Sequence, residues 1–427
     1  MERAILHVDV NSAFLSWEAV YRIHHLGGTL DLREVPSAVG GDQEKRHGII
    51  LAKSIPAKKY KIHTGESVLD AKRKCPGIIL VPPNYGLYQR SSKALMKILL
   101  RYTSKIEQYS IDEAFMDITG TEKIFGNPEK VANEIRETVY KELGFTVNIG
   151  VSSNKILAKM ASDFRKPNLV HTLWPHEIEQ KMWPLPVRNL FFVGHATEAK
   201  LHSLGIRTIG DIAVYDPAIL QAHMHKHGLL VWQYANGQDI TDVIDIAPPN
   251  KGYGNSTTIA FDVTDAQTAK LVLLSLSETV SARLRADNAK ISVVAVGIRD
   301  YNLNYSSCQT TLSTSTDLTI EIYQAACRCF DELWSGIPIR HLGVHTERVD
   351  GSECRQISLF DKIDYGKQKR AEMAVDELRR RYGIDCIKRA SFIESPSANK
   401  KGKYIDHMSG GISREKRSVD YSKEIIV

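Results

Sequence analysis

The chain has 427 residues, of which 43% are hydrophobic and 25% charged, and its formal net charge is +6. This composition is that of a soluble globular protein, and the length leaves room for three or four domains. No apolar run approaches the length of a membrane span, the N-terminus lacks a signal-peptide core, and the six cysteines have neither metal-site pairing nor disulfide density. We therefore expect a cytoplasmic protein with no membrane association. The moderately basic charge permits a polyanionic partner without establishing one.

The N-terminal segment begins as a strand and continues as a helix. We expect a strand over residues 2–9, in which the apolar residues Ala4, Ile5, Leu6 and Val8 lead to Asp9, and a helical period follows over 13–24. A strand that ends in an acid just before a helix brings its carboxylate to the edge of a sheet. Many proteins use such an acid only to cap the helix, so Asp9 by itself indicates little.

Asp112 and Glu113 lie side by side within YSIDEAFMDIT, residues 109–119, which otherwise reads as a strand. Neighbouring side chains of a strand point to opposite faces, so a strand interior would bury one unpaired carboxylate, at a cost of roughly several kcal/mol. A turn at the pair, or a bound cation, would compensate. Together with Asp9 they make three hard oxygen ligands, which suit magnesium rather than zinc or copper.

The remaining pattern predicts an α/β region followed by a separate C-terminal one. In the α/β region we expect strands at 47–54, 107–118 and 145–153, and helices at 55–62, 67–74, 85–106, 128–143 and 154–164.

Paired prolines and nearby glycines at 242–256 indicate an interdomain linker. Beyond it, strands and helices follow as βαββαβ between residues 256 and 349. After residue 362, one helix face is formed by Ala371, Val375, Leu378 and Tyr382, and Gly383 could end this helix. Residues 394–427 are rich in Ser, Gly and Lys, which predicts disorder.

Five collinear motifs resemble those of the Y-family translesion DNA polymerases, with the UmuC-like branch the most similar. The motifs are HVDVNSAFLSWE (7–18), PSAVGGD (36–42), YSIDEAFMDIT (109–119), VNIGVSSNKILAKMASDFRKPN (147–168) and LPVRNLFFVGHATEAKLHSLGIRTIGDIA (185–213). The resemblance implies an α+β multidomain fold with these parts: a palm at 1–11 and 84–173, fingers at 12–83, a helical thumb at 174–241, a linker at 242–252, a βαββαβ little finger at 253–362, and a C-terminal helix and tail at 363–427.

By this resemblance the three acids form a two-metal site. Asp9 and Asp112 bridge two Mg²⁺ ions held about 4 Å apart, Glu113 holds the ion nearest the primer end, and the Val10 carbonyl completes the site. The implied activity is low-fidelity, template-directed synthesis past DNA lesions, as part of DNA repair and the SOS response, with primer–template DNA and a dNTP as substrates.

The resemblance also assigns the nucleotide-binding residues. Phe14 aligns with the aromatic steric gate under the sugar 2′ position, and Lys166 in RKPN aligns with a phosphate-binding lysine. Two positions depart from the family pattern: Lys58 stands where the family has arginine, and Ile55 where it commonly has tyrosine. Because a lysine is a point charge rather than a two-pronged donor, we expect a different or weaker grip on the triphosphate.

DNA is expected to contact the thumb and the little finger. Turns at Gly194 and Gly205 resemble a helix-hairpin-helix, whose amides approach a phosphate, although Phe192 replaces the first hairpin glycine of the family. An ordinary pair of helices is the alternative interpretation. In the little finger, the candidate phosphate partners are Arg283, Arg285, Arg299 and Arg340.

The segment QISLF, residues 356–360, resembles the peptide with which bacterial polymerases bind the sliding clamp. Gln356 would be the polar anchor, and Leu359 and Phe360 would enter an apolar pocket of the ring. The alternative is that both apolar side chains pack on the little finger as an ordinary domain end. We otherwise expect a monomer, and the need for accessory subunits stays open.

Two other functions use part of the same pattern. A nucleotide cyclase with a related palm would use similar acids and metals, but it would need neither the hairpin module nor a βαββαβ clamp on DNA. A catalytically silent DNA-binding or regulatory relative predicts the loss of at least one acid, whereas all three are present. No exonuclease motif set is seen, so we do not expect proofreading.

Overall fold

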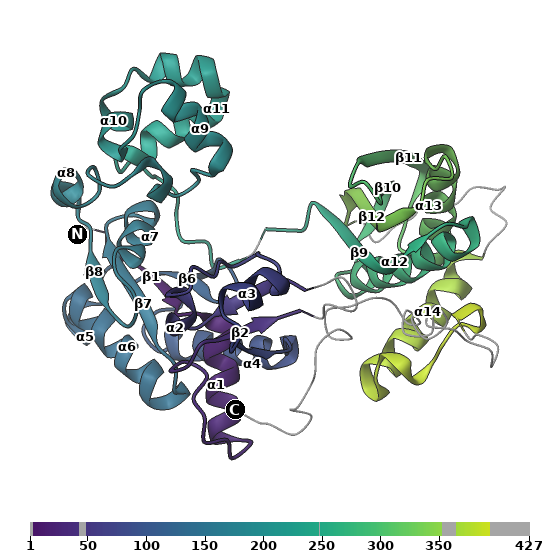
Figure 1. Ribbon diagram of the computed structural model, residues 1–427, viewed down its shortest axis with the longest axis horizontal. Helices are drawn as coiled ribbons and strands as arrows, with labels where there is room; N and C mark the ends of the chain where they lie inside the picture. The colour runs from purple at the N-terminus through teal and green to yellow at the C-terminus, as the bar shows by residue number, and fades with distance from the viewer. Residues whose placement is uncertain (1–2, 42–47, 247, 352–363, 393–427) are drawn as a thin grey trace. The chain divides into compact units, whose positions relative to one another are not determined.

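A computed structural model describes residues 3–41, 48–246, 248–351 and 364–392 (Figure 1). The chain divides into two compact units, which consist mainly of residues 1–40 with 50–247, and of 248–419. The proposed clamp peptide at 356–360 and the tail at 394–427 lie outside the described residues. Within those residues, no helix combines the length and the apolar character that crossing a membrane requires.

A five-stranded sheet organises the N-terminal unit, in the order β5-β6-β1-β7-β8. Its strands are β1 (Ile5–Val10), β5 (Ile106–Gln108), β6 (Glu113–Asp117), β7 (Val147–Ser152) and β8 (Val170–Thr172). The central strand β1 is buried along its whole length and pairs antiparallel with both β6 and β7. The predicted strand pair at 107–118 is therefore β5 and β6, joined by a turn.

Helices cover both faces of this sheet (Figure 1). Leu6, Val8 and Val10 face one core with α1 (Ala13–His24), α4 (Tyr85–Leu99) and α6 (Pro128–Leu143), and the short α5 (Glu122–Phe125) precedes α6. The other residues of β1, which include Ile5, face α7 (Lys155–Asp163). The predicted bounds of α1 and α6 are confirmed. Asn127 caps α6 by accepting from the Lys130 amide, and Gly144 ends it at φ 71°.

The segment predicted to form the fingers contains a three-stranded sheet, β3-β2-β4. Its elements are β2 (Ser37–Gly40), β3 (Ile50–Lys53), β4 (Ile79–Val81), α2 (Ile55–Lys58) and α3 (Val68–Lys74). The strands β2 and β4 were not predicted, because each has only three or four residues and too little pattern to detect.

The segment predicted to form the thumb is helical. It contains α8 (Ile178–Lys181), α9 (His195–Ser203), α10 (Ile209–Val214) and α11 (Pro217–Ala235), which share one apolar core. Gly205 takes φ 81° in the turn between α9 and α10, as its predicted role requires. Gly194 instead has φ −89° at the start of α9, and the left-handed residue of that turn is Phe192, at φ 70°.

The C-terminal unit confirms the predicted βαββαβ order. It consists of β9 (Gly252–Val263), α12 (Ala266–Ala286), β10 (Lys290–Asp300), β11 (Tyr305–Thr316), α13 (Thr319–Leu333) and β12 (Ile339–Asp350). The antiparallel sheet has the order β11-β10-β12-β9, and α12 and α13 share its apolar core.

The following helix, α14 (Tyr365–Tyr382), forms where predicted and ends at Gly383. The prediction that its apolar residues form a buried face was wrong. Leu378 and Tyr382 are exposed, and the buried residue is Glu372. Its carboxylate accepts from the Thr319 amide and pairs with Arg285. The helix is therefore docked by ion pairs rather than by an apolar stripe.

Close approach of β7 to α7 depends on Gly150. A Cβ atom at this position would lie 1.9 Å from the Ala158 carbonyl oxygen and 2.5 Å from the Ser162 nitrogen. We expect Gly150→Ala to lower the free energy of unfolding by roughly 3 kcal/mol or more, because backbone atoms cannot yield as flexible side chains do. Gly77→Ala is the control, since its Cβ would meet open space. Equal urea midpoints for the two variants would contradict this account.

Candidate active site

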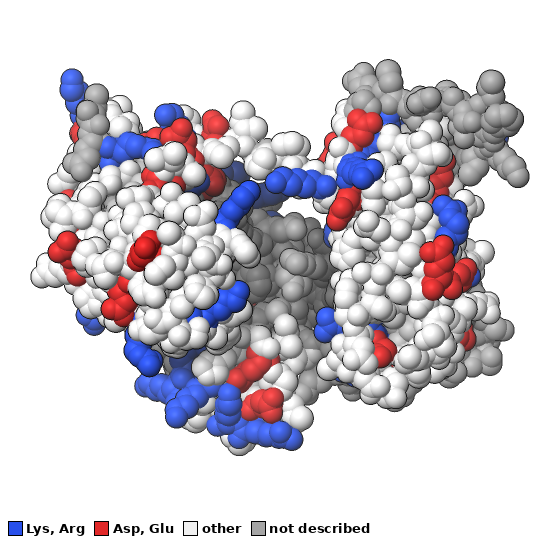
Figure 2. All heavy atoms as spheres, turned by 90° about the horizontal axis from the view of Figure 1, so that it is seen from above, with Lys and Arg blue, Asp and Glu red and all other residues white. Residues whose placement is uncertain are grey.

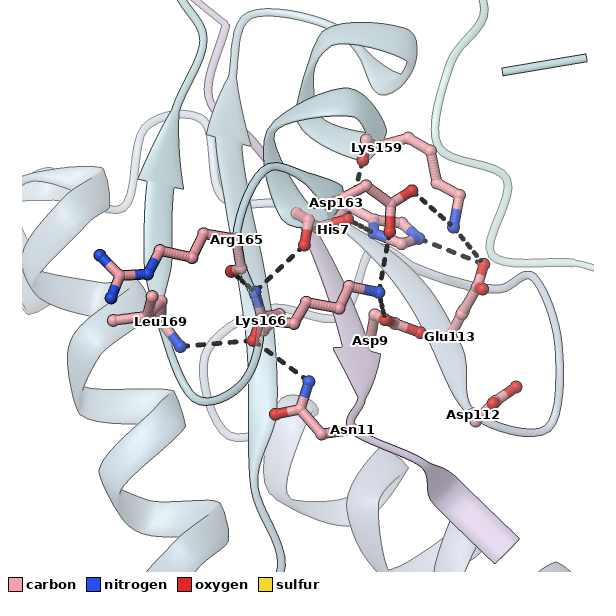
Figure 3. A network of polar contacts seen from close by, with 12 residues as sticks. His7, Asp9, Asn11, Asp112, Glu113, Lys159, Asp163, Arg165, Lys166 and Leu169 are labelled. Atoms are coloured by element: carbon pink, nitrogen blue, oxygen red, sulfur yellow. Dashed lines mark hydrogen bonds and ion pairs between the residues drawn. The ribbon is translucent and has the colours of Figure 1, made fainter. Parts of the chain in front are cut away.

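The two strands β1 and β6 bring the predicted acids together at one end of the sheet (Figure 3). Asp9 pairs directly with Glu113, so both side chains lie on the α7 face. Asp112 occupies the turn before β6, where its carbonyl accepts from the Val10 amide at 3.0 Å. The prediction that the acid pair sits at a turn is confirmed.

Asp9 carries a buried negative charge. Asp9 is only 7% exposed, and its carboxylate contacts the Lys166 ammonium. Lys166 Nζ also lies 2.8 Å from Asp163 Oδ1. Burial raises the pKa of Asp9 to about 6 even though Lys166 opposes this. For Lys166, burial disfavours the charge, but Asp9 and Asp163 together raise the pKa of the ammonium.

Glu113 has two partners on the α7 face, Lys159 Nζ at 2.9 Å and His7 Nε2 at 3.4 Å. Burial alone would raise the pKa of Glu113, but His7 and Lys159 outweigh it and lower the pKa to about 2. His7 is fully buried, and burial lowers the pKa of its imidazole to about 4. Its Nδ1 lies 2.8 Å from Ser162 Oγ. The imidazole is therefore neutral at physiological pH.

Asp112 stands apart from this network in Figure 3. Its Oδ1 accepts from Ser110 Oγ at 2.7 Å. Across the described ranges, no three His, Cys, Asp or Glu side chains are grouped so that they could hold a metal ion. The donor set nevertheless fits a hard divalent cation, because all three side chains offer carboxylate oxygens. Two of these carboxylates already have ammonium groups as counter-charges.

A cavity of about 240 Å³ adjoins Asp112. Its lining includes Asp112, Phe14, Lys58 and Lys53. The Phe14 ring stacks on Tyr88, with centroids 4.4 Å apart and planes 8° from parallel. The structure thus places the expected gate and one expected phosphate ligand together.

Two other predicted nucleotide residues do not line this cavity. Ile55 is 47% exposed on α2. Lys166 is engaged by Asp9 and Asp163.

Sequence reasoning missed Lys159 and Lys53. Lys159 is buried among apolar residues in LAKMA, and a lysine inside such a run needs an acidic partner, which is the signal that could have identified it. Lys53 ends β3 in a stretch with several other lysines, so no feature of the local pattern distinguishes it.

The predicted DNA contacts differ in accessibility. Gly194 and Gly205 have open space where a side chain would be, and Arg283 and Arg299 are exposed, whereas Arg340 is half-buried. Figure 2 shows Lys and Arg side chains gathered along the lower edge of the left-hand part.

The prediction for Arg285 needs correction. Its side chain is only 6% exposed, and its guanidinium is bound by Glu372 and Asp376. It is an interior residue rather than a phosphate contact.

Comparison with known proteins identifies the family. The impB/mucB/samB family model matches residues 8–163, its C-terminal domain model residues 250–359, and its helix-hairpin-helix motif residues 175–206. A DNA polymerase IV of Clostridium acetobutylicum is 43% identical over 394 residues, which cover 92% of this chain and 99% of the relative. The chain belongs to the impB/mucB/samB family.

Other family members and a solved structure agree. A DNA polymerase IV of Acetivibrio thermocellus is 39% identical over 405 residues, 94% of this chain and 100% of the relative. A Y-family DNA polymerase chimera superposes with a TM-score of 0.69, covering 81% of this chain and 99% of that one, at 22% identity. The Y-family resemblance and the multidomain α+β fold are confirmed.

The pairing of Lys159 with Glu113 makes a prediction about acid stability. The pKa of Glu113 is about 2 in the fold against an ordinary 4.5, so its contacts with His7 and Lys159 stabilise the fold above pH 4.5, and this contribution is lost as the pH falls toward 2. We expect Lys159→Met to lower the free energy of unfolding by about 2 kcal/mol at pH 7 and by less at pH 3. Urea unfolding without metal measures the free energy of unfolding at each of these pH values. Lys93→Met, at an exposed position on α4, is the control; a Lys159→Met deficit that does not change with pH would refute the assignment.

Proposed function

We propose that this chain is a DNA-directed DNA polymerase of the translesion type, which joins a dNTP to a primer 3′-hydroxyl. The observation that carries the proposal is the position of Asp9, Asp112 and Glu113 at one end of β1 and β6, where Asp112 lines a cavity together with Phe14 and Lys58. Its relatives are named DNA polymerase IV, which supports the same reaction class.

The residues that would hold two Mg²⁺ ions are the three acids and the Val10 carbonyl. When bound, such ions supply positive charge to the primer hydroxyl and to the α-phosphate, where negative charge develops. Until then, Lys166 and Lys159 neutralise Asp9 and Glu113. If ions were bound, they would share the negative charge of Asp9, and Lys166 could then neutralise a phosphate.

The other residues of the cavity select and hold the nucleotide. The Phe14 ring, which stacks on Tyr88 and lines the cavity, would exclude a nucleotide with a 2′-hydroxyl. Lys58 supplies positive charge for the triphosphate. A nucleotide cyclase is less well supported, because the family match extends over the hairpin motif at 175–206 and the C-terminal domain at 250–359.

We also propose that the polymerase acts in the SOS response as a UmuC-like enzyme and works as a monomer. A further proposal is that it binds a sliding clamp through Gln356, Leu359 and Phe360. A polymerase that leaves its template quickly gains most from a tether, because the ring raises its effective concentration at the primer end.

The metal-site assignment is tested by primer extension with Mg²⁺. Asp112→Asn and Glu113→Ala should each reduce extension by roughly 100-fold or more, because each removes a carboxylate that would hold a Mg²⁺ ion beside the reacting phosphate. Binding of primer–template DNA and circular dichroism should stay unchanged. The control is Asp117→Asn, at the other end of β6, whose carboxylate lies 3.8 Å from Lys105. Near-normal extension by either site variant would reject the assignment.

The steric-gate role of Phe14 is tested with ribonucleotides. Phe14→Ala should insert rNTPs much more readily than the wild type, because removal of the ring opens space beside the sugar. Phe14→Tyr keeps the ring and should keep the selectivity. If Phe14→Ala folds and still rejects rNTPs, the ring is only a core residue stacked on Tyr88.

A further inference from the structure

Lys53 occupies an unassigned position in the cavity beside the acids. It is the last residue of β3, it is half-buried, and it lines the cavity together with Lys58. Its Nζ donates to Thr64 Oγ1 at 3.2 Å, and Thr64 lines the same cavity. The hydrogen bond holds the ammonium group beside the open space.

Within the described part of the chain, the charge of Lys53 has no direct counter-charge. Among residues with a described placement, neither Lys53 nor Lys58 has a carboxylate within ion-pair distance. Burial and, after it, the charge of Lys58 lower the pKa of Lys53. Glu66 opposes this, but its own carboxylate is held by Lys74 at 2.6 Å.

This arrangement contrasts with the two lysines on the palm side. Lys159 and Lys166 each have a carboxylate partner, Glu113 and Asp9 respectively. The positive charge that remains to be neutralised is therefore concentrated at the fingers side of the cavity. A multiply charged anion is the ligand that neutralises two neighbouring ammonium groups most effectively.

The lining and the volume of the cavity indicate which kind of anion it would bind. The lining combines cationic groups from β3 and α2 with the Asp112 carboxylate and the Phe14 ring. A volume of about 240 Å³ is below the usual range for a whole drug-sized ligand, so it suits the sugar and phosphates of a nucleotide rather than its base as well.

We propose that Lys53 binds the triphosphate of the incoming nucleotide together with Lys58. This inference rests on the proposed polymerase function and adds a residue to it. The charge of Lys53 compensates for the tyrosine and arginine of the family, which Ile55 and Lys58 replace in this chain. Two separate point charges replace one planar, two-pronged donor and a hydroxyl, so the triphosphate is held by charge more than by hydrogen-bond geometry.

The test measures single-nucleotide insertion of dCTP opposite template dG. Lys53→Met and Lys53→Gln should each raise the KM for dCTP roughly 10-fold, which is the loss of one charged contact, with little change in kcat. Lys53→Arg keeps the charge and should return the KM toward the wild-type value. The matched control is Lys59→Met, an exposed lysine beside α2 that does not line the cavity.

A second measurement separates nucleotide from DNA. The Kd for primer–template DNA without nucleotide should be equal in wild type, Lys53→Met and Lys59→Met. If Lys53→Met leaves the KM for dCTP unchanged while the wild type extends primers, this inference fails and the polymerase function stands. If Lys53→Met weakens DNA binding instead, the lysine contacts the template and the inference also fails. A wild type that does not extend primers with Mg²⁺ would instead refute the proposed function itself.

Discussion

Negative charge buried on the α7 face of the central sheet is the constraint on which the N-terminal unit depends. Alternation along β1 places Asp9 on that face, and the pairing with β6 adds Glu113 beside it. An isolated carboxylate cannot be buried there without a large loss of solvation free energy. Lys159 on α7 and Lys166 just after it provide the compensating charge. The sheet and α7 must therefore lie close together, which Gly150 permits.

The same constraint acts differently in the C-terminal unit. Arg285 is held between Glu372 and Asp376, and Glu278 accepts from Arg379 and Arg389. Buried ion pairs add little net stability compared with apolar packing, but they penalise any arrangement that separates the partners. The C-terminal helix α14 is consequently held in one orientation by charge, although its sequence suggested an apolar face.

One departure from the family pattern, Phe192, lies at a position of backbone strain. Phe192 takes a left-handed conformation at φ 70°, which costs a residue with a Cβ roughly 1–2 kcal/mol. Its ring lies 4.4 Å from that of Phe191 and 6.0 Å from that of Tyr234, between centroids. These contacts offset part of the strain. The hairpin motif is matched at 175–206 although its first glycine is replaced. Nothing in the described structure explains Ile55, which is exposed.

The sequence by itself indicated most of the long strands and helices, although not the short strands β2 and β4, and it singled out Asp9, Asp112 and Glu113 as candidate metal ligands. Helix α6 could be placed to the residue, because its cap at Asn127 and its end at Gly144 are local signals. The turn at Asp112 followed from the cost of burying two adjacent charges. The βαββαβ order could be predicted because strands and helices have different hydrophobic periods, which are a local property of the sequence.

Only the tertiary structure decided which charges meet. Lys159 approaches Glu113 from 46 positions away, and Arg285 approaches Glu372 from 87. The packing of α7 on the sheet and of α14 on the C-terminal unit determines which charged residues pair. The local sequence pattern contains no information about this packing. For the same reason Lys53 could not be distinguished from the lysines that follow it. Its importance comes from the cavity that β3 forms with the start of α1, and that cavity exists only once distant segments have packed.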